Sequence, residues 1–155
     1  MESLFAAMES TAVAEYLRIS RWGYAAVNTT HILGITLLVG SIIPFNLHLL
    51  GLWRNIPRPM LARVLLPVAA TGLVLAVIAG SLLFLVNTTQ YAGIGFFQAK
   101  IVLVVLGTLL ALLLYRRYGL SLEGATETRL KVHALLSMLC WLGALVCGRL
   151  IAFVV

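Results

Sequence analysis

The sequence predicts an all-α integral membrane protein, a four-helix up-down bundle with an N-terminal amphipathic interfacial helix. Of its 155 residues, 62% are hydrophobic and 10% are charged, whereas a soluble domain has about 25% charged residues. Apolar stretches near or above the roughly 20 residues of a spanning helix recur four times. They lie at about 24–53, 61–86, 97–117 and 132–155. Strand-like alternation is absent, so these stretches favour helices.

Residues 1–21 are expected to form a surface helix, and residues 22–155 the bundle, with no second domain. Between Glu2 and Arg21 apolar residues recur at helical spacing, with the charged residues largely off that stripe. This pattern is typical of a helix lying in the membrane interface, although a helix that docks on a partner protein would show it too. The N-terminus has no basic n-region, so we expect no cleavable signal peptide.

The first apolar stretch, 24–53, has His31 near its beginning and His48 near its end. Seventeen helical positions correspond to roughly 25 Å, nearly the thickness of the hydrocarbon core, so one imidazole lies near each membrane face. An ionisable residue at this depth usually faces the bundle interior and marks a functional site. A hydrogen bond to a neighbouring helix explains each histidine equally well. Pro44 either kinks the helix and aims His48 inward or only adjusts packing.

The second and third stretches contain few polar residues. Gly72, Ala76 and Gly80 recur every four positions in 61–86, a pattern that indicates a helix-packing surface. In the first stretch, Gly34 and the Gly40-Ser41 pair predict a similar close approach of another helix. Lys100 opens the third stretch, where it is expected to extend toward the lipid head groups.

The basic residues predict the orientation. Seven of the eleven Lys and Arg residues lie on the side of the first and third connections; they are Arg54, Arg58, Arg63, Arg116, Arg117, Arg129 and Lys131. By the positive-inside rule this side is cytoplasmic. We therefore expect a multi-pass protein of the bacterial inner membrane with both termini in the periplasm. The basic residues are scattered among loops rather than gathered with aromatics, so a nucleic-acid partner is not expected.

His48 and His133 could meet at the cytoplasmic side. His48 ends the first helix and His133 begins the fourth, so they share one membrane level in an up-down bundle, where the first and last helices are normally neighbours. Two such imidazoles suit a b-type haem with bis-histidine ligation, and Arg54, Arg58 or Lys131 could pair with its propionates. The outer level holds a second group of candidate cofactor-binding residues, His31, Lys100 and Arg149, which contains only one histidine. His31 there could bind a cofactor with a weaker partner or donate a hydrogen bond to a quinone.

Copper is the competing use of the fourth helix. His133, Cys140 and Cys147 recur every seven positions and share approximately one face. Together with Met60 and Met138 they include ligands that Cu(I) accepts. Cysteines in membrane helices usually only pack, however, and seven-residue steps place ligands about 10 Å apart, so one ion cannot use the stripe alone. Copper therefore ranks below haem.

Three segments carry a resemblance to a family. They are ESTAVAEYLRISRWGYAAVNTTHILGITLLVGSIIPFNLHLLG, TGLVLAVIAGSLLFLVNTTQY and FFQAK. Together they resemble a family of small uncharacterised bacterial four-helix membrane proteins, and more distantly the membrane domains of copper-resistance D proteins and dihaem cytochromes b. The resemblance implies a four-helix fold with haem or copper, and His31 and Lys100 match its pattern. Asn28 stands where the pattern often has an acidic residue, and His48 where it commonly has arginine.

The leading functional hypothesis is a membrane electron-transfer protein that binds one haem b between His48 and His133 and exchanges electrons with a quinone or a partner subunit. A non-catalytic structural or anchoring subunit of a larger membrane complex and a copper-handling protein are the alternatives. A partner subunit or a homo-oligomer is expected as well. The chain has no Asp, and its Glu residues lie in the N-terminal segment and the polar loop. Hydrolytic catalysis has little support as a result, and an electron-transfer or accessory subunit is expected rather than a stand-alone enzyme.

Overall fold

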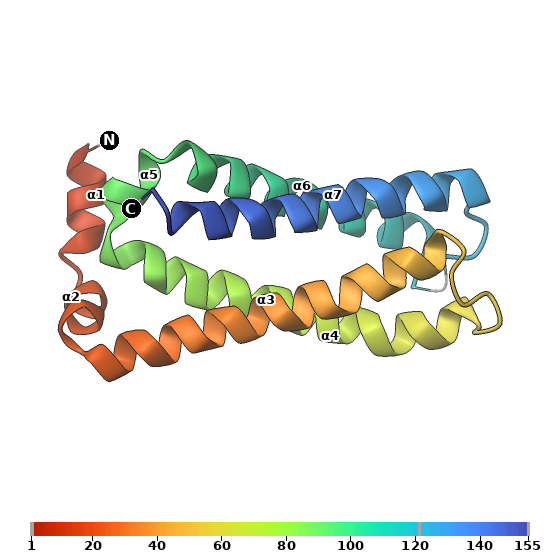
Figure 1. Ribbon diagram of the computed structural model, residues 1–155, viewed down its shortest axis with the longest axis horizontal. Coiled ribbons are helices and arrows are strands. Elements are labelled where there is room, and N and C mark those ends of the chain that lie inside the picture. The colour runs from red at the N-terminus through yellow and green to blue at the C-terminus, as the bar shows by residue number, and fades with distance from the viewer. Residues whose placement is uncertain (1, 121, 155) are drawn as a thin grey trace.

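The computed structural model describes residues 2–120 and 122–154, and 84% of the chain is helical with no strand in the described part. In these described residues seven helices follow one another (Figure 1). They are α1 (Glu2–Glu9), α2 (Ala12–Ile19), α3 (Arg21–Leu49), α4 (Arg58–Val86), α5 (Thr88–Ala92), α6 (Gly95–Tyr118) and α7 (Glu127–Ile151).

Four of these helices, α3, α4, α6 and α7, are long and apolar enough to cross a membrane. The prediction of an all-helical chain with four candidate membrane spans is therefore confirmed. The observed ends differ from the predicted ones by several residues. The helix α7 begins five residues before the apolar stretch because Thr126 caps it, accepting a hydrogen bond from the Arg129 amide. The helix α3 ends at Leu49 because Gly51 and Trp53 take positive φ angles.

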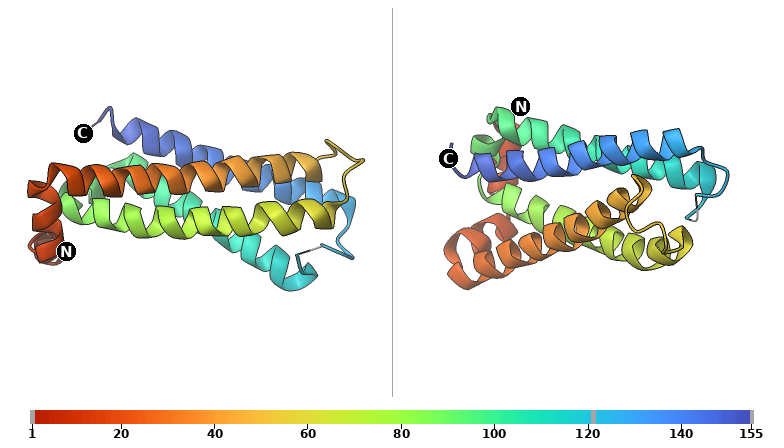
Figure 2. Two further views of the ribbon diagram at one scale, coloured as in Figure 1. Left: turned by 90° about the horizontal axis from the view of Figure 1, so that it is seen from below. Right: turned by 45° about the vertical axis from the view of Figure 1, so that its right-hand side comes forward.

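The long helices form two antiparallel pairs (Figures 1 and 2). The helix α3 packs along α4, the helix α6 packs along α7, and the two pairs join where α3 meets α7. In the described residues α4 and α6 do not pack backbone against backbone. The side of the bundle between α4 and α6 is therefore its loosest seam.

Glycines bring α3 and α4 together. A Cβ atom on Gly34 would lie 2.5 Å from the Ala76 amide nitrogen, and one on Gly72 would lie 2.5 Å from the Leu38 amide nitrogen. The predicted packing role of these small residues is confirmed. Gly40 is different because a Cβ atom there would have no described neighbour within 4 Å, so the close approach expected at that position is wrong within this chain.

A buried core joins the two pairs at the end of the bundle formed by the α3–α4 and α6–α7 connections, which we call the arginine end. Phe45 on α3 and Leu130 and Ala134 on α7 are fully buried there. The Asn46 amide donates a hydrogen bond of 2.9 Å to the Ser137 hydroxyl. This bond pairs the Asn46 amide nitrogen with the Ser137 hydroxyl and links α3 to α7, while Oδ1 of Asn46 has no partner in the described residues.

The N-terminal segment forms two short helices, so the expectation of one continuous helix over residues 1–21 is wrong. The chain breaks at Ser10 and Thr11 because the Thr11 side chain caps α2, accepting a hydrogen bond from the Ala14 amide. Both helices lie across the end of the bundle that carries α5, the α5 end (Figure 1). Glu9 accepts a hydrogen bond of 2.8 Å from the Thr89 amide there, and Arg18 donates one of 3.0 Å to the Val86 carbonyl.

Candidate functional site

A cavity of about 400 Å³ lies between the two helix pairs, toward the α5 end. All four long helices line it, and nearly all of its lining is apolar. The side chains that form its walls are mainly aliphatic, including Ile35, Leu38, Val39, Leu73, Val77, Ile101, Val104 and Leu145. Its size falls within the range of small-molecule sites in proteins. The few polar groups in it therefore decide what it can bind.

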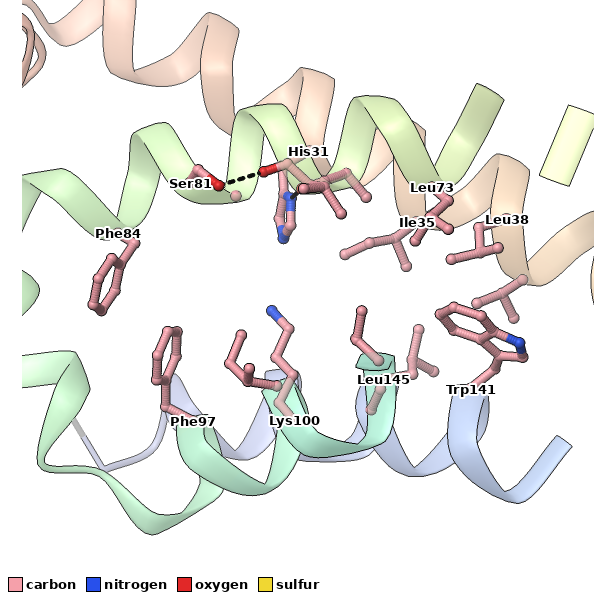
Figure 3. A pocket seen from close by; sticks show the side chains of 17 residues that line it. His31, Ile35, Leu38, Leu73, Ser81, Phe84, Phe97, Lys100, Trp141 and Leu145 are labelled. Atoms are coloured by element: carbon pink, nitrogen blue, oxygen red, sulfur yellow. Dashed lines mark hydrogen bonds between the residues drawn. The ribbon is translucent and has the colours of Figure 1, made fainter. Parts of the chain in front are cut away.

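His31 enters the cavity from α3 (Figure 3). Its Nδ1 lies 2.8 Å from the Ala76 carbonyl oxygen of α4. Because a carbonyl only accepts, Nδ1 must carry the proton, and in the neutral ring Nε2 is then a lone-pair acceptor. The ring fits because residue 80 is glycine, where a Cβ atom would lie 2.8 Å from Cε1 of His31. The α3–α4 seam therefore fixes both the position and the tautomer of this imidazole.

Lys100 enters from α6 on the opposite side, and its ammonium group points toward the His31 ring (Figure 3). Its side chain runs past Gly148 of α7, where a Cβ atom would lie 3.5 Å from Nζ. The side chain thus extends into the cavity. The expectation that it extends toward the head groups is wrong. Among the described residues Lys100 makes no hydrogen bond or ion pair, and no Asp or Glu lines the cavity.

Aromatic side chains close the cavity at both ends. At the α5 end the rings of Phe84 and Phe97 stack with centroids 5.0 Å apart and planes 6° from parallel, and Tyr91 packs on Phe97. Trp141 lies at the other end (Figure 3). The Ser81 hydroxyl also lines the cavity, but it donates to the Val77 carbonyl of its own helix. Nε2 of His31 and the ammonium group of Lys100 are therefore the polar groups of the cavity that could bind a ligand.

The third residue of the expected outer cluster does not join them. Arg149 is exposed on α7, its guanidinium lies 5.1 Å from the centroid of the Phe153 ring, and it does not line the cavity. The cavity contains one histidine and one lysine, without the arginine that the sequence placed at the same level.

The two histidines expected to bind haem each use one nitrogen on a backbone carbonyl. Nδ1 of His48 lies 3.1 Å from the Leu52 oxygen, and Nε2 of His133 lies 3.2 Å from the Leu110 oxygen. On each ring the other nitrogen has no hydrogen bond in the described residues. His133 lines a pocket between α6 and α7 that His48 does not line. A haem held by both rings stays a prediction.

The cysteines of α7 do not gather with other metal ligands. Cys140 is buried, and its Cβ lies 3.3 Å from the position that a Cβ on Gly107 would occupy, so it packs against α6. Cys147 is half-buried, and both thiols are free. In the described part of the chain, no group of three or more His, Cys, Asp or Glu residues could hold a metal ion. The copper alternative therefore gains no cluster from the fold.

No protein-family model, curated protein or solved structure matches this chain.

The aromatic ends of the cavity were not predicted as functional. Phe84 and Phe97 lie on different helices, and no local pattern in the sequence places their rings in a stack. Trp141 offered a signal, because it is a tryptophan in the middle of an apolar stretch rather than at its end, where the interface usually places this residue.

Proposed function

We propose that this protein binds a quinone-type ligand taken from the bilayer, within the electron-transfer class that its sequence indicates. The opposed placement of His31 and Lys100 in an otherwise apolar cavity carries the proposal. One residue offers a hydrogen-bond acceptor, the other offers a cationic donor, and they come from different helix pairs. A ligand that needs both groups must sit between the pairs.

Quinone chemistry suits this pair of groups. A hydroquinone hydroxyl can donate to Nε2 of His31 while another ring oxygen accepts from the Lys100 ammonium. An oxidised quinone has only acceptor oxygens, so neutral His31 adds nothing to its binding. The site is therefore expected to prefer the reduced or partly reduced ligand, with the aromatic and aliphatic walls packing on its ring.

The loose seam between α4 and α6 supports entry from the lipid. A second cavity of about 310 Å³ lies along the same helices and shares Leu38, Leu73 and Trp141 with the first. Its lining is almost entirely apolar. An isoprenoid tail placed there would remain in an environment like the bilayer while the ring occupied the first cavity.

The sequence-based predictions of topology, membrane, orientation and haem are part of this proposal. They are an up-down bundle in a bacterial inner membrane, N-terminal helices lying in the outer interface, the arginine end in the cytoplasm, and one haem b between His48 and His133 as the electron partner. The unused nitrogen on each of these two rings supports the haem.

Trp141 supplies the test, because quinones quench indole fluorescence and this indole lines the cavity. In the Trp22→Phe, Trp53→Phe background Trp141 is the remaining tryptophan. We expect saturable quenching by a short-tailed hydroquinone. The Lys100→Met variant should weaken it about tenfold or more, as expected for a lost hydrogen bond to a charged group.

Matched variants sharpen the result. His31→Leu removes the acceptor and should weaken the hydroquinone more than the oxidised quinone. Arg149→Gln removes one positive charge from the last turn of α7, outside the cavity, and should leave both affinities unchanged. Quenching that is unsaturable, or equal in the Lys100→Met and Arg149→Gln variants, would reject the proposal.

An anionic lipid-derived amphiphile, such as a long-chain fatty acid, is the second candidate. The absence of any acidic residue in the described lining of the cavity favours it, because a carboxylate would neutralise Lys100. In the same titration a fatty acid would displace the hydroquinone. If only the fatty acid binds, the chain carries lipids rather than electrons, and if neither binds, the anchoring role remains.

A further inference from the structure

A second polar site lies at the arginine end, far along the bundle from the His31 and Lys100 cavity. A shallow, largely open pocket of about 520 Å³ lies between the last turns of α6 and the first turns of α7. Its polar side chains include Arg117 and Tyr118 of α6 and Arg129 of α7, with Thr126 at the start of α7. Thr128 and His133 line it as well, and leucines and a valine form the rest of the wall.

The two arginines are held by one tyrosine. The guanidinium carbons of Arg117 and Arg129 lie 5.6 and 5.8 Å from the centroid of the Tyr118 ring, and Arg129 also donates a hydrogen bond to the tyrosine hydroxyl. Cation–π contacts of this kind orient guanidinium groups without neutralising them. Two positive charges from two helices are therefore presented at one pocket.

No carboxylate balances these charges in the described part of the chain. The pocket has no Asp or Glu in its lining, and the ion pair at this end joins Glu127 to Arg58 instead, at 3.4 Å. The first turn of α7 adds its helix dipole, since Thr126 caps the helix and lines the same pocket. A pair of guanidinium groups beside a helix N-terminus favours a phosphate group.

The apolar wall indicates that this phosphate belongs to a lipid. Leu113, Val132 and Leu136 line the pocket and are 67%, 50% and 44% exposed. They lie on the outer surface of candidate membrane spans, where acyl chains would cover them. His133 also lines the pocket, but its side chain is buried and its Nε2 already donates a hydrogen bond to the Leu110 carbonyl.

We propose that this pocket binds the phosphate of an anionic phospholipid between Arg117 and Arg129, with the acyl chains along Leu113 and Leu136. The site is independent of the quinone proposal, because the two cavities share no lining residue. Basic pockets between membrane helices are known to take acidic head groups, and each basic residue near the surface contributes about 1 kcal/mol.

Native mass spectrometry of the detergent-purified chain tests the proposal. Dimyristoyl phosphatidylglycerol is titrated against phosphatidylcholine of the same chain length. We expect one tight phosphatidylglycerol per chain, and about tenfold or more weaker binding in the Arg117→Gln, Arg129→Gln double variant. The control is Arg116→Gln, Lys131→Gln, which removes the same charge from the same two helix ends but outside the pocket. It should bind the lipid as the parent chain does.

Each alternative outcome is decisive. Equal binding of the two lipids, or equal loss in both double variants, would overturn the site in favour of non-specific interfacial charge. Displacement of phosphatidylglycerol by millimolar inorganic phosphate would assign the site to a free anion and overturn the lipid. If the double variant fails to fold, Arg117→Gln alone leaves the hydrogen bond from Arg129 to Tyr118 in place. It should still weaken the lipid several-fold.

Discussion

Replacing Gly34 by alanine should separate α3 from α4 and disturb the ligand cavity with it. The new methyl group would lie 2.5 Å from the Ala76 amide nitrogen and 2.8 Å from the Gly72 carbonyl oxygen. Both atoms belong to the α4 backbone, so no side chain can rotate away. Since non-bonded carbon contacts relax at about 3.5 Å, the two helices must move apart by about 1 Å.

The magnitude follows from a matched pair of variants. Overpacking of this kind costs about 1–3 kcal/mol, while any glycine to alanine change inside a helix gains up to about 1 kcal/mol of helix propensity. Gly40 lies on the same helix, is exposed, and has nothing within 4 Å of its potential Cβ. The difference in unfolding free energy between Gly34→Ala and Gly40→Ala is therefore the packing cost alone, about 1–3 kcal/mol.

The same shift reaches His31, which lies one helical turn before Gly34. The hydrogen bond of 2.8 Å from His31 to the Ala76 carbonyl would lengthen beyond hydrogen-bonding distance if α3 moved by about 1 Å. We expect Gly34→Ala to weaken hydroquinone quenching of Trp141 and Gly40→Ala to leave it unchanged.

Reversible unfolding in mixed detergent micelles, followed by circular dichroism, measures the stability difference, and the Trp141 titration measures binding. If Gly34→Ala unfolds at the same detergent composition as Gly40→Ala and binds equally well, the close approach of α3 and α4 is refuted.

Three further predictions use other contacts. Lys100→Met should raise the unfolding free energy by about 1 kcal/mol or more, because it removes an unpaired charge from the apolar interior, while binding weakens; the same unfolding assay measures it. The hydrogen bond from the Thr89 amide holds the pKa of the Glu9 carboxylate below its usual 4.5. The ionised Glu9 carboxylate therefore stabilises the N-terminal helices above pH 4.5, and this stabilisation is lost as the pH falls through the lower pKa of the folded state. Proteolysis of the N-terminal segment should show this pH dependence, and the Glu9→Gln variant should lack it. A bound haem b would give a Soret band that His48→Ala or His133→Ala removes, whereas a colourless purified protein would reject it.

The spans could be predicted because crossing a membrane depends on a local property of the sequence, the length of an apolar stretch. Their ends could not, because caps and polar turns extend a helix past its apolar part, as Thr126 does for α7. Residues 1–21 show the converse. Helical spacing of apolar residues continues through Ser10 and Thr11, but capping of α2 by Thr11 breaks the helix there.

The sequence predicts the components of the candidate site but not its assembly. His31 and Lys100 were both singled out, yet Lys100 was expected to extend toward the head groups. Its actual direction depends on how α6 packs along α7, where the side chain runs past Gly148, and on the lack of backbone packing between α4 and α6 in the described residues. Both are properties of tertiary packing, which the spacing of residues along one helix does not contain.

The N-terminal helices have a specific role because α4 and α6 are only loosely packed. Because α4 and α6 do not pack backbone against backbone in the described residues, their spacing near the cavity depends on the segment that connects them, 87–94. Glu9 binds the Thr89 amide within that segment, and Arg18 binds the Val86 carbonyl just before it. The two contacts come from helices that lie across the end of the bundle (Figure 1). They therefore restrain the connection at the α5 end of the cavity, where Phe84 of α4 stacks on Phe97 of α6. That stack is the contact between α4 and α6 that a ligand entering from this end would have to separate.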